Sequence, residues 1–252
     1  MDLPEGVRPD PRAVQPIRLV AIDPGFEVQA VEQQRAPDAA REAAAAAAWR
    51  SASERERALG DGPMLCLVEA DRRRLVGRLL RRSEVLAGRR DPRLFGGCAP
   101  EPVSVGGLIS SHGRLLVGRR RDAAPGGEGG WELVAAEDLD DAFLERATRR
   151  VDYRGALLAR LVECAPLARP PRERLVPFAL AHDVEAGRWR LCLALELASG
   201  AQAFEDLERS ETCAYDAFRF VRPVDVIESG AEELDPLSAA LVRLPRADVS
   251  AA

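Results

Sequence analysis

The sequence of 252 residues contains no lysine and no asparagine, and all 36 of its basic residues are arginine. A lysine is required for Schiff-base catalysis and for the phosphate-binding loop of Walker-type ATPases. The composition therefore excludes both of these function classes. Arginine therefore supplies all the permanently positive side chains, and its planar guanidinium suits bidentate contacts with phosphate or carboxylate groups.

Histidine and cysteine are also scarce. The two histidines, His112 and His182, have no cysteine or histidine at the spacing of zinc ligands, which argues against a structural zinc site. The five cysteines include no C-x-x-C pair. We therefore expect reduced and mostly buried thiols at positions 66, 98, 164, 192 and 213.

Long apolar runs are missing as well. No segment approaches the length of a membrane-spanning helix, and residues 1–14 lack the pattern of a secretory signal. We therefore expect a cytoplasmic protein that does not bind a membrane. The net charge of −5 argues against nucleic acid as a partner. A hydrophobic share of 46% and a charged share of 31% are ordinary for a soluble globular protein.

Several segments show strand or helix patterns. The alanine-, glutamate- and arginine-rich segment 38–59 predicts a helix, and Ser83 is a candidate N-cap for a second helix over 82–91. A third, amphipathic helix is predicted within 154–167. Strands are predicted at 17–22, 64–70, 74–81, 103–110, 114–120, 131–135, 175–183, 188–197 and the start of 217–228. Strands mixed with a few helices indicate an α/β or α+β fold.

A loop at 91–102, rich in proline and glycine, separates two parts of the chain. We predict an α+β region over 17–100 and a second domain over 101–245. The proline- and charge-rich residues 1–16 predict a disordered tail, and residues 246–252 a C-terminal tail.

Three segments of the second part follow one another in a specific order. "VSVGGLISSHGRLLVGRR" (103–120) has the form of paired strands, "GGWELV" (129–134) is led by a tryptophan, and "VDYRGALLARLVECAPL" (151–167) contains the predicted helix. In this order they resemble the Nudix hydrolase superfamily. Together with the upstream part, the outline over 38–228 resembles the branch that acts on UDP-sugars and related nucleoside diphosphates. The resemblance implies a Nudix fold, a mixed sheet sandwiched between helices, preceded by a smaller α+β region.

The residues with which this superfamily holds magnesium are mostly replaced. In the helix that aligns with the Nudix box, only Glu163 keeps one of the paired glutamates. Arg160 stands at the position of the box's first glutamate, and Cys164 at that of its last. The other box positions hold Ala159, Leu161, Pro166 and Leu167, and the glycine pair upstream falls on Glu137 and Asp138.

The replacement changes the charge of one helix face. Positions 160, 163 and 164 lie three and four residues apart, so they share a face of the helix. Three glutamates would give that face a charge of about −3, whereas Arg160, Glu163 and Cys164 give about zero. Arg160 and Glu163 can pair directly and place a guanidinium where a metal would bind. Without a metal, a diphosphatase loses its charge neutralisation and its activated water.

Other residues could supply parts of a site. Glu137 and Asp138 could join Glu163 as metal ligands, or they could belong to an exposed acidic turn. Arg119 and Arg120 could contact the phosphates of a substrate, or they could form surface ion pairs. Trp131 could seal the core or stack on a base. Cys164 is expected to be a buried apolar residue and not a nucleophile.

Three function hypotheses follow. The leading hypothesis is a catalytically eroded Nudix-fold protein that needs no cofactor and serves as a binding or scaffolding module. Its partner would be another protein, a second copy in a homodimer, or a larger assembly. The alternative is an active diphosphatase that hydrolyses UDP-sugars or related nucleoside diphosphate derivatives with Mg²⁺ or Mn²⁺. The third is a sensor that binds a nucleotide without cleaving it.

Overall fold

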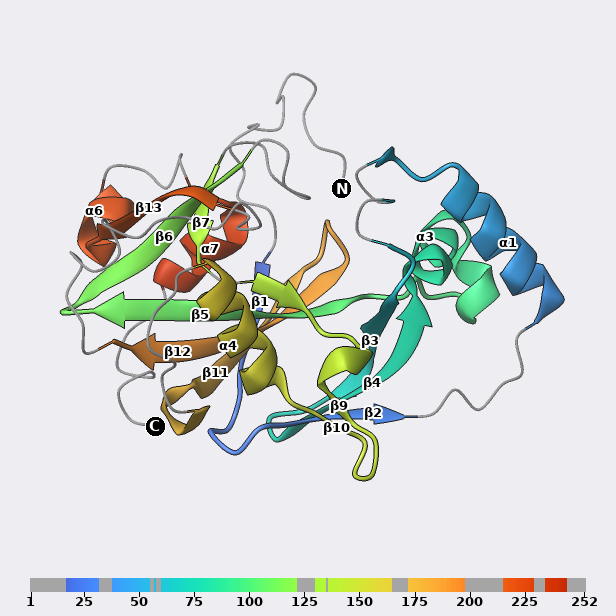
Figure 1. Ribbon diagram of the computed structural model, residues 1–252, viewed down its shortest axis with the longest axis horizontal. Helices are drawn as coiled ribbons and strands as arrows, with labels where there is room; N and C mark the ends of the chain where they lie inside the picture. The colour runs from blue at the N-terminus through green and yellow to red at the C-terminus, as the bar shows by residue number, and fades with distance from the viewer. Residues whose placement is uncertain are drawn as a thin grey trace, which may run out of the picture.

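The computed structural model describes residues 17–31, 38–54, 57, 60–121, 130–134, 136–164, 172–197, 215–228 and 234–243. The tails predicted over 1–16 and 246–252 lie outside this part of the chain. The described residues form two mixed β-sheets and five α-helices (Figure 1). The chain is therefore a mixed α/β protein of the α+β kind, as the sequence predicts.

The larger sheet, sheet A, contains the strands that carry the Nudix-like motifs. Its order is β1 (Ile17–Ala21), β11 (Val176–Asp183), β12 (Arg188–Glu196), β5 (Val103–Ser111), β6 (Arg114–Arg120) and β13 (Tyr215–Val221). Strand β7 (Trp131–Leu133) pairs with β6, and β8 (Ala136–Asp138) pairs with β5. The pairing of β12 with β5 is parallel, while the other pairs in the sheet are antiparallel.

The smaller sheet, sheet B, contains five strands. Its order is β3 (Pro63–Ala70), β4 (Arg74–Arg81), β2 (Glu27–Val31), β10 (Arg150–Val151) and β9 (Leu144–Glu145). Strands β3 and β4 form the predicted hairpin, and β2 lies parallel to β4. Beside this sheet, α1 (Ala39–Arg50) packs against α3 (Arg82–Arg90).

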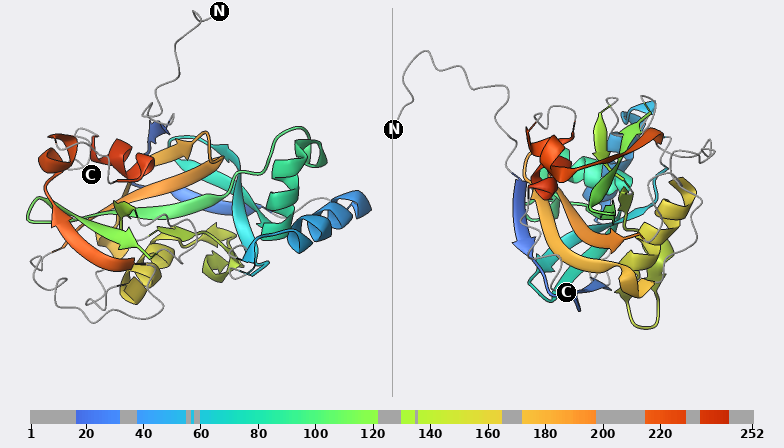
Figure 2. Two further views of the ribbon diagram at one scale, coloured as in Figure 1. Left: turned by 90° about the horizontal axis from the view of Figure 1, so that it is seen from above. Right: turned by 90° about the vertical axis from the view of Figure 1, so that its left-hand side faces the viewer.

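Helices cover both faces of sheet A. On one face, α4 (Tyr153–Cys164) packs against β5 and β8, and Leu157 and Leu161 are buried in the main core with Leu191. On the other face, α7 (Pro236–Val242) packs in a second core, with α6 (Pro223–Glu228) next to it (Figure 2). Sheet A therefore lies between helices. None of the described helices has both the length and the apolar character needed to cross a membrane.

Local chemistry starts α4 at Tyr153. The Asp152 carboxylate accepts a hydrogen bond from the Gly155 N–H, as an N-cap residue does. A side chain at position 155 would collide with that carboxylate unless Asp152 moved, so glycine at this position lets the cap form as it stands. Leu157 and Leu161, one turn apart, are essentially inaccessible to solvent, and each contributes about 2 kcal/mol by burial. This packing fixes the helix face that bears Arg160 and Glu163.

The two sheets do not divide the chain near residue 100. Strand β1, from the predicted N-terminal region, pairs with β11 at the edge of sheet A. Strands β9 and β10, from the predicted second domain, extend sheet B through the pairing of β10 with β2. Each sheet therefore contains strands from both sides of the predicted boundary, because these pairings join residues that are far apart in the sequence.

The prediction of Ser83 as an N-cap is wrong. Helix α3 begins at Arg82, so Ser83 lies inside its first turn. The backbone N–H and the hydroxyl of Ser83 both donate to the Asp61 carboxylate, at 2.7 and 2.9 Å. Glu84 accepts a hydrogen bond from the backbone N–H of Arg81 and so caps the helix from within. The predicted helix over 38–59 corresponds to α1, which ends at Arg50.

Candidate functional site

Arg160 lies between two carboxylates at the position where the Nudix box would hold a metal. Its Nη1 donates to Oε2 of Glu163 at 2.7 Å, which is the pair that the helical spacing predicts. Its Nε lies 3.5 Å from Oε2 of Glu137 on strand β8. The Arg160 side chain is mostly buried, with 19% of its surface exposed. The guanidinium therefore lies between the two acids that a cation would need.

Sheet pairing brings Glu137 to α4. Strand β8 runs antiparallel to β5, with Glu137 opposite Val105, and α4 packs against both strands. The neighbouring Asp138 has a different partner, since its Oδ2 lies 3.3 Å from Nη2 of Arg82 on α3. Consecutive residues of a strand point in opposite directions, which explains why Glu137 and Asp138 do not share a partner.

Burial changes the acidity of Glu137. The pKa of its carboxyl group is raised from 4.5 to about 7, mainly by removal from water and to a smaller extent by nearby Asp138, Glu163 and Asp140. Arg160 acts in the opposite direction because a cation favours the ionised form. The cost of burial is the larger effect, so Glu137 is partly protonated near neutral pH.

The contribution of Glu137 to the stability of the protein is expected to fall as the pH rises from about 4.5 to about 7. In this window the native state holds a proton on Glu137 that the unfolded chain has released, so raising the pH favours unfolding. Because the Glu137 side chain is partly exposed, we expect the free energy of unfolding to fall by about 1 kcal/mol. This is well below the value that the whole pKa shift would give for a fully buried group. Urea unfolding of the wild type and of Glu137→Gln at pH 5 and pH 8 measures this. A stability difference between the two proteins that stays constant with pH would contradict the assignment.

The predicted substrate contacts also have partners. Arg119 forms a two-point ion pair with Asp216 of β13, at 2.8 and 3.1 Å. Arg120 lies 2.8 Å from the buried carboxylate of Glu132. Arg119 therefore matches the alternative of a surface ion pair, whereas the ion pair of Arg120 with Glu132 is mostly buried. Whether either one also meets a substrate phosphate stays a prediction.

Trp131 contributes to the second core. Its half-buried ring packs against the cluster that includes Val117 and Leu237. The guanidinium of Arg219 lies 4.0 Å from the ring centre, a cation–π distance. Arg219 therefore covers part of the ring surface on which a base would stack.

The residues on the α4 face do not fit a magnesium ion. Magnesium needs a near-octahedral set of oxygen ligands, and the two nearest carboxylates here, Glu137 and Glu163, both contact Arg160. In the described ranges, no three or more His, Cys, Asp or Glu side chains are grouped so that they could hold a metal. Cys164 ends α4, but its side chain lies outside the described part of the structure.

Comparisons with known proteins identify no family for this chain. The chain matches no protein-family model, and a search of curated proteins finds no similar sequence. The Nudix resemblance therefore rests on the sequence motifs alone.

Proposed function

We propose that this protein is a Nudix-like binding module that does not carry out metal-dependent hydrolysis at its α4 face. The observation that carries the proposal is the position of Arg160, which pairs with both Glu137 and Glu163. A fixed cation among these carboxylates repels divalent metal ions and removes the ligands that would bind them. Under this proposal, the fold serves recognition of a protein partner, a second copy or a larger assembly.

The arrangement of the helix supports the same conclusion. The apolar face of α4 is buried in the main core. This packing stabilises the helix whatever charge its other face has. Asp138, the remaining acid of the predicted metal set, is engaged by Arg82 from α3. An active diphosphatase would have to break three ion pairs before a metal could bind all three acids.

We expect no turnover of UDP-glucose by the purified chain with Mg²⁺ or Mn²⁺, measured as release of UMP. The missing charge neutralisation is the reason, since a bound metal supplies much of the stabilisation in diphosphate cleavage. Glu163→Gln serves as the matched variant. Metal-dependent turnover that disappears in Glu163→Gln would overturn the proposal and establish the diphosphatase alternative.

Two further measurements separate the remaining hypotheses. A nucleotide that binds only the folded protein must raise its melting temperature, so a thermal-shift screen with UDP, UMP and UDP-glucose tests the nucleotide sensor. A protein that copurifies with the chain, or a dimer mass in light scattering, supports the scaffold. A nucleotide-dependent shift in Tm without turnover favours the sensor over the scaffold.

A further inference from the structure

A cavity of about 520 Å³ lies between strands of sheet B and the first turn of α4, at the opposite end of α4 from Arg160 and Glu163. Its walls come from the turn before β2, from β9 and β10, from the first turn of α4, and from the short helix η3 (Arg172–Arg174). These elements are distant in sequence, so only the tertiary structure forms the cavity. A volume of this size suits a small organic molecule.

The apolar part of the cavity wall is rigid. Phe26, Val28, Val151 and Tyr153 line it and are buried in the main core. The Tyr153 hydroxyl donates to the carbonyl oxygen of Phe26 at 2.6 Å, which ties the start of α4 to the turn before β2. Burial raises the pKa of Tyr153 above its usual value, so the ring stays neutral at physiological pH.

Two ion pairs on the wall balance their own charges. Arg150 and Glu27 lie 2.7 Å apart between β10 and β2, and Arg172 and Asp152 lie 2.8 Å apart between η3 and α4. All four side chains are at least one-third exposed, so each pair contributes little to stability and leaves the cavity neutral at that point.

One arginine and one glutamate remain after this pairing. Arg154 uses Nε and Nη2 to donate to the carbonyl oxygens of Leu175 and Pro24, which are neutral acceptors. Among the described residues, no carboxylate forms an ion pair with it. Glu145 accepts a hydrogen bond from the Thr148 hydroxyl, again a neutral partner. The cavity therefore has one positive and one negative group that are not balanced locally.

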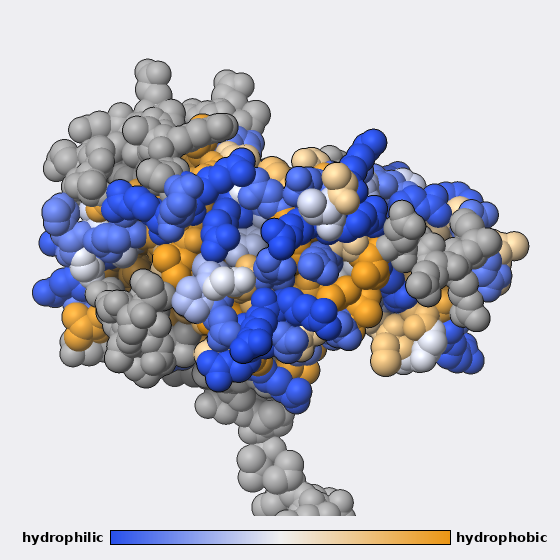
Figure 3. All heavy atoms as spheres, turned by 90° about the horizontal axis from the view of Figure 1, so that it is seen from below, coloured by the Kyte–Doolittle hydropathy of each residue, from blue (hydrophilic) through white to orange (hydrophobic). Residues whose placement is uncertain are grey.

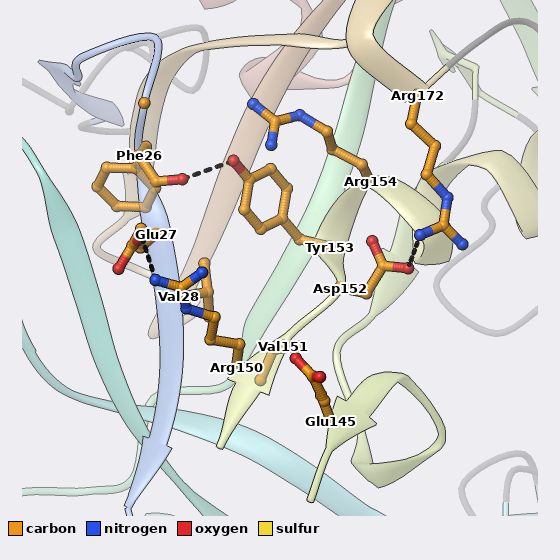
Figure 4. Close-up of a pocket in the computed structure, with 11 residues that line it drawn as sticks. Phe26, Glu27, Val28, Glu145, Arg150, Val151, Asp152, Tyr153, Arg154 and Arg172 are labelled. Carbon is orange, nitrogen blue, oxygen red and sulfur yellow. Dashed lines mark hydrogen bonds and ion pairs between the residues drawn. The ribbon is translucent and has the colours of Figure 1, made fainter. Parts of the chain in front are cut away.

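These two groups lie at opposite ends of the cavity. Figure 4 shows the Arg154 guanidinium near Phe26 and Tyr153, and Glu145 at the far side of Val151 and Asp152. Figure 3 shows the face of the molecule seen from below, where hydrophilic side chains surround smaller apolar areas. A ligand that spans the cavity would meet a cation at one end and an anion at the other.

We propose that this cavity binds a small zwitterion, of the class of free amino acids and short peptides. Arg154 has N–H groups that do not donate to the carbonyl oxygens of Leu175 and Pro24, and the ligand's carboxylate would accept hydrogen bonds from them. The ligand's ammonium group would face Glu145. Equal numbers of arginines and acids give the wall no net charge, so it lacks the excess of cations that would favour a polyanion such as a nucleoside diphosphate. This site is independent of the α4 face and of whether that face hydrolyses anything.

The test uses the full chain and the series alanine, dialanine and trialanine, in which the two charges move progressively apart. We expect at least one member at about 10 mM to raise the melting temperature at constant ionic strength, because it binds the folded state only. The matched controls are the N-acetyl form, which lacks the cation, and the C-terminal amide, which lacks the anion. Both should bind at least about tenfold more weakly, since each loses one charged contact.

Two variants locate the binding. Glu145→Gln keeps an acceptor for Thr148 but removes the charge, and it should abolish the preference for the free peptide over its N-acetyl form. Arg154→Gln should abolish the preference over the amide. The control variant is Glu185→Gln, an exposed glutamate in the turn between β11 and β12. If Arg154→Gln fails to fold, Glu145→Gln alone decides the proposal.

The proposal is overturned if no member of the series raises the melting temperature, or if blocked and free peptides bind equally. It is also overturned if pyrophosphate binds more tightly than every peptide, or if Glu185→Gln weakens binding as much as Glu145→Gln does. None of these results depends on the UDP-glucose assay, so failure here and failure of the proposed function are distinguishable.

Discussion

Arg160→Glu is expected to destabilise the metal-free protein by about 2–4 kcal/mol and to create a response to Mn²⁺ that the wild type lacks. With every carboxylate ionised, the wild-type face of Glu137, Arg160 and Glu163 has a formal charge of −1, and the substitution changes this to −3. Both ion pairs are lost, and three acids then repel one another on a half-buried surface. A bound divalent cation would relieve the repulsion.

Thermal unfolding in EDTA and in millimolar MnCl₂ measures both effects. The melting temperature of Arg160→Glu should rise by several degrees with Mn²⁺, since a ligand of the native state stabilises it by mass action. Arg160→Gln is the matched control: it removes the cation without adding an acid, so it should be destabilised but show a much smaller response to Mn²⁺. A wild-type protein that responds to Mn²⁺ as strongly as Arg160→Glu would show that Arg160 does not exclude the metal.

Glu132→Ala is expected to cost about 3–5 kcal/mol of stability, the largest loss among the substitutions considered. Glu132 is buried in β7, accepts a hydrogen bond from the Tyr215 hydroxyl at 2.6 Å, and lies 2.8 Å from Nη2 of Arg120. Burial alone would lower the pKa of Arg120, but Glu132 and Tyr215 raise it, so the guanidinium stays charged inside the protein. Without Glu132, that cation loses its nearest counter-ion.

Matched variants separate the charge from the packing. Tyr215→Phe removes one hydrogen bond and should cost about 1 kcal/mol. The double variant Arg120→Met with Glu132→Leu should recover most of the loss, because a buried ion pair can be replaced by apolar side chains of similar size. Urea unfolding with a constant m-value gives the comparison. A loss in Glu132→Ala no larger than that in Tyr215→Phe would mean that water reaches Arg120 and replaces the carboxylate.

Several parts of the fold follow from local sequence. The hairpins β3–β4, β5–β6 and β11–β12 were predictable because each joins two strand patterns across a short turn. Helix α4 was predictable from the spacing of Leu157, Leu158 and Leu161. Helix α7 was not predicted, although Asp235 and Pro236 form an N-cap with proline at the first helical position. Strands β9 and β10 have two residues each, too few to show an alternating pattern.

For the candidate site, the sequence by itself determined the pair of Arg160 with Glu163, because residues three apart on a helix are neighbours whatever surrounds them. Only the tertiary structure decided that Glu137 also contacts Arg160, that Arg82 engages Asp138, and that Glu132 neutralises Arg120. These contacts depend on strand pairings such as β8 with β5 and on helix packing across the sheet. Such pairings join residues that are far apart in the sequence, so the local pattern of hydrophobic residues does not predict them.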